Sequence, residues 1–207
     1  MNQLAPNTQI LMLDNQDSFT YNLVDELAQI GCQLEVYRNT TALDTVINEL
    51  SRLEQLGPVL IVLSPGPGHP REAGILMPLL AHVVGKYPVL GICLGFQAIV
   101  EYFGGEVARC YETVHGKTAY IDTTTHPIFE DTNNSSMVAR YHSLMATAVP
   151  SELEIIAKTR DIPMAVSHQA MPCVGFQFHP ESIMTTDGSL LLQRTVAYLT
   201  RTQHIQE

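Results

Sequence analysis

The chain has 207 residues, of which 45% are hydrophobic, and its 21 acidic and 11 basic side chains give a formal net charge of −10. A chain of this length can bury one large core, so we expect a single domain over residues 1–207. Phosphate recognition needs a clustered basic surface, so the charge argues against a nucleic-acid partner and favours a metabolite or a protein.

The cysteine pattern and the N-terminal stretch both bear on where the protein is located. The chain start lacks the basic region and cleavage site of a signal peptide, and no apolar run approaches the about 18 residues of a membrane span. We therefore expect a cytoplasmic protein with no membrane partner. No Cys-x-x-Cys pair is present, which fits free thiols better than a disulfide framework or a zinc site. The scattered cysteines are Cys32, Cys93, Cys110 and Cys173.

Apolar runs of strand length alternate with stretches of helical period through the first half of the chain. Because strands that are apolar throughout and separated by helices suit a sheet covered on both faces, the pattern predicts a flavodoxin-like, doubly wound α/β fold with a mostly parallel sheet. The predicted strands are Ile10–Leu13, Leu34–Tyr37, Val59–Leu63 and Val89–Ile92. The predicted helices are a run through Leu23, Leu27 and Ile30 that ends at Gly31, then Leu43–Leu53, Ile75–Val84 and Gln97–Phe103.

The pattern changes from about Glu106. Shorter alternating segments follow one another with turns between them, which predicts a smaller antiparallel extension. A last helix is predicted from Leu190 to Leu199. The predicted strands of the extension are Ala119–Ile121, Met137–Tyr141, Leu153–Ala157, Met164–Val166 and Val174–Phe178.

The stretch GICLGFQ, residues 91–97, places Cys93 between two glycines where a buried strand ends and a helix begins. Open α/β sheets bind ligands at the carboxyl ends of their strands. The pattern is typical of a nucleophile elbow with cysteine in place of serine, and a helix N-terminus favours the thiolate. The N–H of Leu94 would then face a developing oxyanion. A buried core cysteine is the alternative.

The stretch LSPGPGHP, residues 63–70, follows another buried strand. Its glycines can present backbone N–H groups to a ligand, whereas Pro67 has none. We expect Gly66 to be the second oxyanion donor and Gly68 to line the substrate pocket. An ordinary rigid turn is the alternative.

The stretch GFQFHPES, residues 175–182, ends a predicted strand. Because side chains alternate along a strand, the alternate aromatic residues of this stretch lie on one face. His179 lies at the end of the strand, where Pro180 interrupts the backbone hydrogen bonding between strands. If the chain stays extended, Glu181 lies beside His179 and can orient the imidazole. The three stretches together supply a nucleophile, a base, an orienting carboxylate and an oxyanion hole. A surface turn is the alternative for this stretch alone.

Other histidines are weaker candidates for the base. His69 lies in the glycine-rich loop with no carboxylate at a useful sequence offset, and His115 and His142 are predicted to make contacts in the antiparallel part. No histidine spacing indicates a metal site, so we expect no metal.

SPGPG, GICLGFQ, RYHSL and GFQFHPES, in this order and at these separations, resemble the class I (triad) glutamine amidotransferases over nearly the whole chain. The resemblance implies that Cys93 attacks the side-chain amide of L-glutamine and forms a glutamyl thioester. It implies His179 as base and then acid, Glu181 as orienter, and no cofactor on this chain. The implied glutamine contacts are Gly66, Pro67, Gly68, Leu94, Gln97, Ser143 and Leu144.

With DNQDSFTYN and HGK added, the chain is similar to the small subunits of anthranilate synthase. This resemblance implies a separate partner, the large chorismate-binding synthase subunit (anthranilate synthase component I), which uses the ammonia in tryptophan biosynthesis. A 4-amino-4-deoxychorismate synthase of folate biosynthesis, or service to both enzymes, is the alternative. We expect partner contacts at residues 115–117, at residues 140–143 and in the loop after the first strand.

One position departs from the family pattern, because Phe96 stands where a histidine is usual. The change affects packing behind the proposed nucleophile rather than the triad.

Two other classes of function remain open. A thiol hydrolase normally has its acid before its histidine, whereas Glu181 follows His179; an inactive regulatory subunit is expected to lack Cys93, His179 or Glu181.

Overall fold

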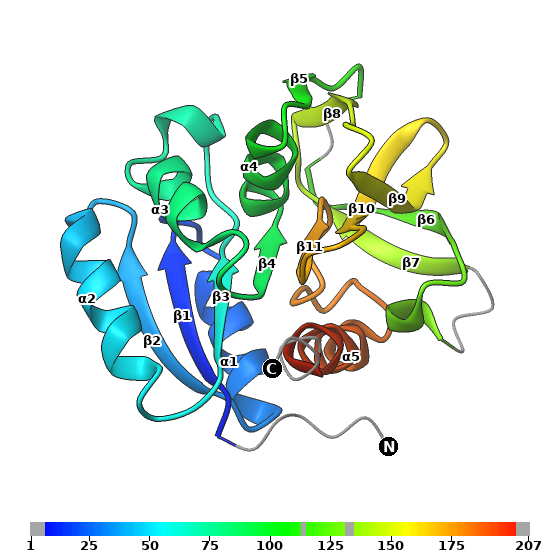
Figure 1. The fold of residues 1–207 in the computed structure, drawn as a ribbon. Coiled ribbons are helices and arrows are strands. Elements are labelled where there is room, and N and C mark those ends of the chain that lie inside the picture. Colours follow the sequence, from blue (N-terminus) through cyan, green and yellow to red (C-terminus); the bar gives the residue numbers. More distant parts are fainter. Residues whose placement is uncertain (1–6, 113–114, 131–134, 202–207) are drawn as a thin grey trace.

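The computed structural model describes residues 7–112, 115–130 and 135–201. Within these residues, nine strands form one sheet (Figure 1). In spatial order the strands are β2 (Gln33–Arg38), β1 (Gln9–Asp14), β3 (Val59–Leu63), β4 (Val89–Ile92), β11 (Cys173–Phe176), β10 (Ile162–His168), β9 (Leu153–Thr159), β6 (Lys117–Thr123) and β7 (Ser135–Arg140). The strands from β2 to β11 are parallel to one another, and those from β11 to β7 pair antiparallel. A parallel sheet in this order is flavodoxin-like, which confirms the predicted fold class.

The described residues also form five α-helices and two short 3₁₀ turns. The helices are α1 (Thr20–Gln29), α2 (Leu43–Leu53), α3 (Leu76–Val83), α4 (Leu94–Tyr102) and α5 (Gly188–Arg201). The 3₁₀ turns are η1 (Pro70–Glu72) and η2 (Pro127–Phe129). No helix in the described part of the chain is both long and apolar enough to cross a membrane.

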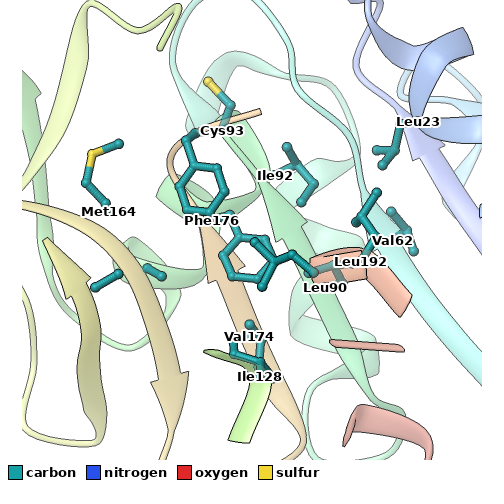
Figure 2. Close-up of a cluster of buried hydrophobic side chains, with 14 of the residues drawn as sticks. Leu23, Val62, Leu90, Ile92, Cys93, Ile128, Met164, Val174, Phe176 and Leu192 are labelled. Carbon is teal, nitrogen blue, oxygen red and sulfur yellow. The ribbon is translucent and has the colours of Figure 1, made fainter. Parts of the chain in front are cut away.

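The two faces of the parallel strands pack against different helices (Figure 1). Ile10 and Met12 of β1 belong to a buried cluster with side chains of α1 and α5. Leu11 and Leu13 belong to a second cluster with side chains of α2, α3 and α4. Alternate residues of one strand therefore enter opposite cores, which is why β1 is apolar throughout. Figure 2 shows part of the first cluster, with Cys93 at its edge.

The placement of β11 corrects the predicted layout. We expected Val174–Phe178 to belong to the antiparallel extension, but β11 pairs parallel with β4 and antiparallel with β10. The tight turn after β10 reverses the chain, and this reversal brings β11 to the open edge of β4. The antiparallel strands are thus a continuation of the main sheet, and the ends of β4 and β11 become neighbours.

Two element boundaries at these ends also differ from the prediction. Helix α4 begins at Leu94, three residues before the predicted start, because the turn at Cys93 leads directly into it. Strand β11 ends at Phe176, two residues early. The Gln177 N–H still bonds to Met164 of the neighbouring β10, but the His179 N–H bonds to the Ala139 carbonyl of β7, so the chain leaves the β10–β11 pairing after Gln177.

Two strands were not predicted. They are β5 (Glu106–Arg109) and β8 (Leu144–Ala148), which pair antiparallel as a separate two-stranded sheet. Both are short and only partly buried, so their alternation is weak in the sequence.

Candidate active site

The predicted nucleophile and base lie where parallel strands end: Cys93 follows β4, and His179 lies just beyond β11. Asn15, which follows β1, and Ser64, which follows β3, lie at the same edge but were not predicted as site residues. The loops after β1 and β3 are joined, because the Asn15 N–H donates to Ser64 Oγ at 2.8 Å and Asn15 Nδ2 donates to the Ser64 carbonyl at 2.9 Å. This edge is where open α/β sheets bind ligands.

Cys93 has the strained backbone of a nucleophile elbow, with φ at 52° and ψ at −95°. A non-glycine residue at such an angle needs support from its surroundings. A Cβ at Gly91 would lie 2.5 Å from the Gly95 backbone, and one at Gly95 would lie 2.4 Å from the Leu63 carbonyl oxygen. The glycines on either side of Cys93 therefore allow α4 to pack directly against β4 and β3. Figure 2 shows the sulfur of Cys93 directed away from the packed side chains below it.

Leu94 and Gly66, the two predicted oxyanion donors, lie side by side. A Cβ at Gly66 would lie 2.7 Å from Leu94 Cδ2 and 2.5 Å from Asn15 Cβ. Leu94 is the first residue of α4, so its N–H has no acceptor within the helix. Neither this N–H nor that of Gly66 bonds to another described residue. Leu94, which directly follows Cys93 at a helix N-terminus, and Gly66, which lies beside the Leu94 side chain, therefore each carry a backbone N–H that no described residue engages.

His179 and Glu181 form a buried pair, with 2.8 Å between Nδ1 and Oε1. His179 is 2% exposed, and the Glu181 side chain is fully buried. Burial lowers the pKa of His179, but interactions with Cys93 and Glu181 outweigh it and hold the pKa well above its ordinary value. Since Glu181 holds Nδ1, Nε2 is the nitrogen that can exchange a proton with Cys93. Nε2 has no hydrogen-bond partner among the described residues.

Two aromatic rings fix the plane of the imidazole. The ring of Phe19, from the loop after β1, lies 5.3 Å from that of His179 between centroids, and the ring of Tyr141 lies 5.1 Å from it. Phe19 and Tyr141 also contact each other, at 4.8 Å. The segments DNQDSFTYN and RYHSL therefore both reach the candidate base.

Gln97 is buried in the first turns of α4, and its Nε2 donates to the Leu144 carbonyl at 3.4 Å and to Gln177 Oε1 at 3.2 Å. Sequence reasoning missed Gln177, whose Nε2 lies 3.7 Å from Cys93 Sγ. A polar side chain between two buried phenylalanines at a strand end was the available signal.

The remaining predicted contacts lie farther out. Pro67, Gly68 and Ser143 are exposed, and Leu144 is half-buried. Gly68 has a φ of 78°, and a Cβ built on it meets no described atom within 4 Å. Among these residues, Leu144 is joined to the site by its carbonyl, which accepts from Gln97 Nε2.

Phe96 is fully buried and packs against β11. A Cβ at Gly175 would lie 3.0 Å from its ring, so the glycine makes room for the aromatic side chain. The position where the family usually has histidine is therefore part of the second buried cluster, whereas Cys93 belongs to the first.

The other histidines have partners of their own. His69 Nε2 lies 3.5 Å from Glu101 of α4, a carboxylate that sequence offset alone did not reveal. His142, predicted as a contact residue, is instead buried: its Nε2 accepts from Arg140 Nε at 3.1 Å, and its Nδ1 bonds to the Leu144 carbonyl at 2.9 Å. Burial and the nearby Arg140 lower the pKa of His142 to about 4. No group of metal-binding side chains was found in the described ranges.

Comparisons with known proteins identify the family of the chain. A family sequence model described as glutamine amidotransferase class-I matches residues 11–198. The chain is 44% identical over 190 residues to the anthranilate synthase component 2 of Haemophilus influenzae, covering 92% of this chain and 97% of that protein. It is 46% identical over 189 residues to the component 2 of Vibrio parahaemolyticus, covering 91% and 95%. The Helicobacter pylori protein of the same name is 42% identical over 191 residues, covering 92% and 97%.

Two solved structures share the fold. A structure from Thermoplasma acidophilum superposes with a TM-score of 0.83 at 22% identity and covers 98% of both chains. A glutamine amidotransferase from Thermotoga maritima superposes with a TM-score of 0.64 at 16% identity, covering 86% of this chain and 77% of its own.

Proposed function

The chain belongs to the class-I glutamine amidotransferases, and on that premise we propose that it hydrolyses L-glutamine as the amidotransferase subunit of an anthranilate synthase. One observation carries the chemical part of the proposal. Cys93 occupies a strained elbow at a helix N-terminus, its N–H bonds to the Phe176 carbonyl at the end of β11, and His179 just beyond that strand is held by Glu181 in a buried pair. A thiol hydrolase built like an α/β-hydrolase is disfavoured because the carboxylate follows the histidine.

In the proposed mechanism, His179 Nε2 takes the proton of Cys93 Sγ, and the thiolate attacks the side-chain amide carbon of glutamine. The N–H groups of Leu94 and Gly66 stabilise the oxyanion of the tetrahedral intermediate. The imidazolium returns its proton to the leaving nitrogen, so ammonia departs and a glutamyl thioester forms. Water, deprotonated by His179, then attacks the thioester and releases glutamate and the free thiol. Glu181 stabilises the imidazolium in both steps.

The proposed glutamine contacts fall into two groups by position. Gly66 and Leu94 lie at the cysteine and would surround the reacting amide. Pro67, Gly68, Ser143 and Leu144 border the site and would bind the amino-acid end, largely through backbone groups. The Gln97 side chain already bonds to protein atoms, so its part in binding would be to support the pocket wall.

The pathway assignment follows the relatives, which are named anthranilate synthase component 2 and are 41–46% identical to this chain over most of its length. We propose that ammonia passes to a large chorismate-binding synthase subunit, anthranilate synthase component I. We further propose that residues 1–207 form one domain, that it needs no cofactor and that it works in the cytoplasm, where its four free thiols would stay reduced.

A reconstitution experiment with two different synthase subunits tests the pathway assignment. The chain is combined with an anthranilate synthase component I and, separately, with the large subunit of a 4-amino-4-deoxychorismate synthase, each with chorismate and glutamine. We expect fluorescent anthranilate in the first mixture. Product in the second mixture alone would move the protein to folate synthesis, and activity in both would indicate a shared subunit. Silence in both would contradict the proposal.

The proposed partner surface includes the HGK stretch. Lys117 is exposed and borders a pocket with Arg140, Arg160 and the exposed Tyr120. His115 contacts Tyr141 at 5.7 Å between ring centroids, and Tyr141 contacts His179, so this surface adjoins the site.

Lys117→Glu is expected to weaken association with the synthase subunit by about tenfold or more at low salt, because opposite charges across an interface speed encounter and set register. The measurement is titration by fluorescence anisotropy at two ionic strengths. Lys86→Glu, at an exposed lysine beyond α3, is the matched control. Equal affinity for both variants and the unchanged chain would remove this surface from the interface.

A further inference from the structure

Gln177 lies between the proposed nucleophile and the wall of the glutamine pocket. It is fully buried, its Nε2 lies 3.7 Å from Cys93 Sγ, and its Oε1 accepts from Gln97 Nε2 at 3.2 Å. The side chain points to the opposite face of the chain from Phe176 and Phe178, which pack in the core. Neither the triad nor the oxyanion donors account for a buried amide at this place.

The orientation of both amides follows from one carbonyl. The Leu144 carbonyl oxygen can only accept hydrogen bonds, so the group of Gln97 that faces it must be the NH₂. The same NH₂ then requires an acceptor from Gln177, which turns Oε1 toward Gln97. The donor end of Gln177 is left facing the sulfur.

The Leu144 carbonyl is itself held by a fixed donor. Arg140 has no acceptor atom, so His142 Nε2 must accept from it, and the proton of the neutral ring resides on Nδ1. Nδ1–H then donates to the Leu144 carbonyl at 2.9 Å. The lowered pKa of His142 keeps the ring neutral at physiological pH, so this arrangement persists. One chain of hydrogen bonds thus runs from Arg140 to Cys93.

We propose that Gln177 donates a hydrogen bond that stabilises the Cys93 thiolate, and that Gln97, His142 and Arg140 are positioning residues that fix its donor end on the sulfur. Thiolate is a stronger acceptor than thiol, so a donor at Sγ favours the reactive form. The inference rests on Cys93 being the nucleophile, and not on the identity of the substrate or partner.

The test measures alkylation of Cys93 by iodoacetamide between about pH 5 and pH 10 on the full chain, followed by peptide mass spectrometry. Neither glutamine nor partner is needed. Cys32 and Cys173 are expected to react slowly because burial raises the pKa of Cys32 to about 11 and of Cys173 to about 12, and the peptide analysis separates Cys93 from the other thiols. Gln177→Met removes the donor without adding charge. In this variant we expect the pH profile of the Cys93 alkylation rate to move about one pH unit higher, so that labelling near pH 7 slows roughly tenfold.

Gln97→Met, which also adds no charge, provides a second test if Gln177→Met fails to fold. It removes the NH₂ group that donates to Gln177 Oε1, so the Gln177 amide is no longer fixed with its donor end on the sulfur. The profile should again move to higher pH. Gln9→Met is the matched control, because Gln9 is also buried but lies at the start of β1, where it bonds to Asn7 and Gln33. Circular dichroism verifies the fold of each variant.

Three outcomes are distinguishable. A shifted profile in the two site variants and an unchanged one in Gln9→Met supports the role of Gln177. If Cys93 is labelled preferentially but the pH profile of its alkylation is the same in every folded variant, this inference is overturned and the proposed function is left intact. Labelling of Cys93 no faster than that of the buried thiols in the unchanged chain overturns the nucleophile, and the inference with it.

Discussion

Cys93→Ala is expected to abolish glutamine-dependent anthranilate formation while leaving ammonia-dependent formation by the synthase partner unchanged. The substitution removes the only atom of the proposed mechanism that bonds to substrate, so glutamine hydrolysis should fall by about 10⁵-fold or more. Free ammonia bypasses this chemistry because it reaches the partner without the thioester. The measurement is anthranilate fluorescence in the assembled complex with glutamine or with ammonium salt as nitrogen donor.

The packing around Cys93 allows this variant to remove the thiol without disturbing the fold. Its sulfur points away from the core cluster and the residue is at a sheet end, so alanine leaves the elbow glycines and α4 in place. Cys32→Ala, at a buried thiol near the start of β2, is the matched control and should retain both activities. Loss of both activities in Cys93→Ala with an intact complex would contradict a separable ammonia source.

Glu181→Gln is expected to lower kcat for glutamine hydrolysis by about 10³-fold to 10⁴-fold, as loss of the orienting carboxylate does in comparable triads. The amide is close to the carboxylate in shape but is neutral. The variant loses one of the two interactions that oppose the effect of burial on His179, so the pKa of His179 falls and the imidazolium deprotonates at lower pH than in the unchanged chain. The measurement is the pH dependence of kcat with the partner present.

Glu101→Gln is the matched control for that prediction. Glu101 is likewise a mostly buried carboxylate paired with a histidine, His69, and it also binds Arg71. It lies near the C-terminal end of α4, whereas Cys93 precedes the N-terminal end. Its replacement should leave kcat within about twofold. A comparable loss in both variants would mean that Glu181 acts through stability, and an unchanged kcat in Glu181→Gln would remove it from the mechanism.

The central strands of the parallel half were predictable because their residues face two cores, and helix α2 was predictable because its apolar residues share one buried face. The bounds of α2, β3 and β4 coincide with the predicted Leu43–Leu53, Val59–Leu63 and Val89–Ile92. In such strands every residue is buried, and turns with glycine or proline mark both ends. In the antiparallel half, β5 and β8 escaped prediction because partial burial leaves little alternation to detect.

The pairing of β11 was beyond sequence reasoning because hydrogen-bonding partners are a long-range choice. Its apolar residues suit either a parallel or an antiparallel neighbour. Only the completed sheet shows that it lies between β4 and β10, and that choice brings His179 to Cys93.

The sequence by itself determined the chemistry available. The elbow glycines around Cys93, the spacing of two between His179 and Glu181, and the glycine-rich loop with Gly66 are local features, and local sterics and alternation make them readable. The tertiary structure alone decided which groups meet. Gln177, the Leu144 carbonyl and the buried His142 come from segments far apart in the chain, and side-chain contacts at such separations depend on the packing of the whole sheet.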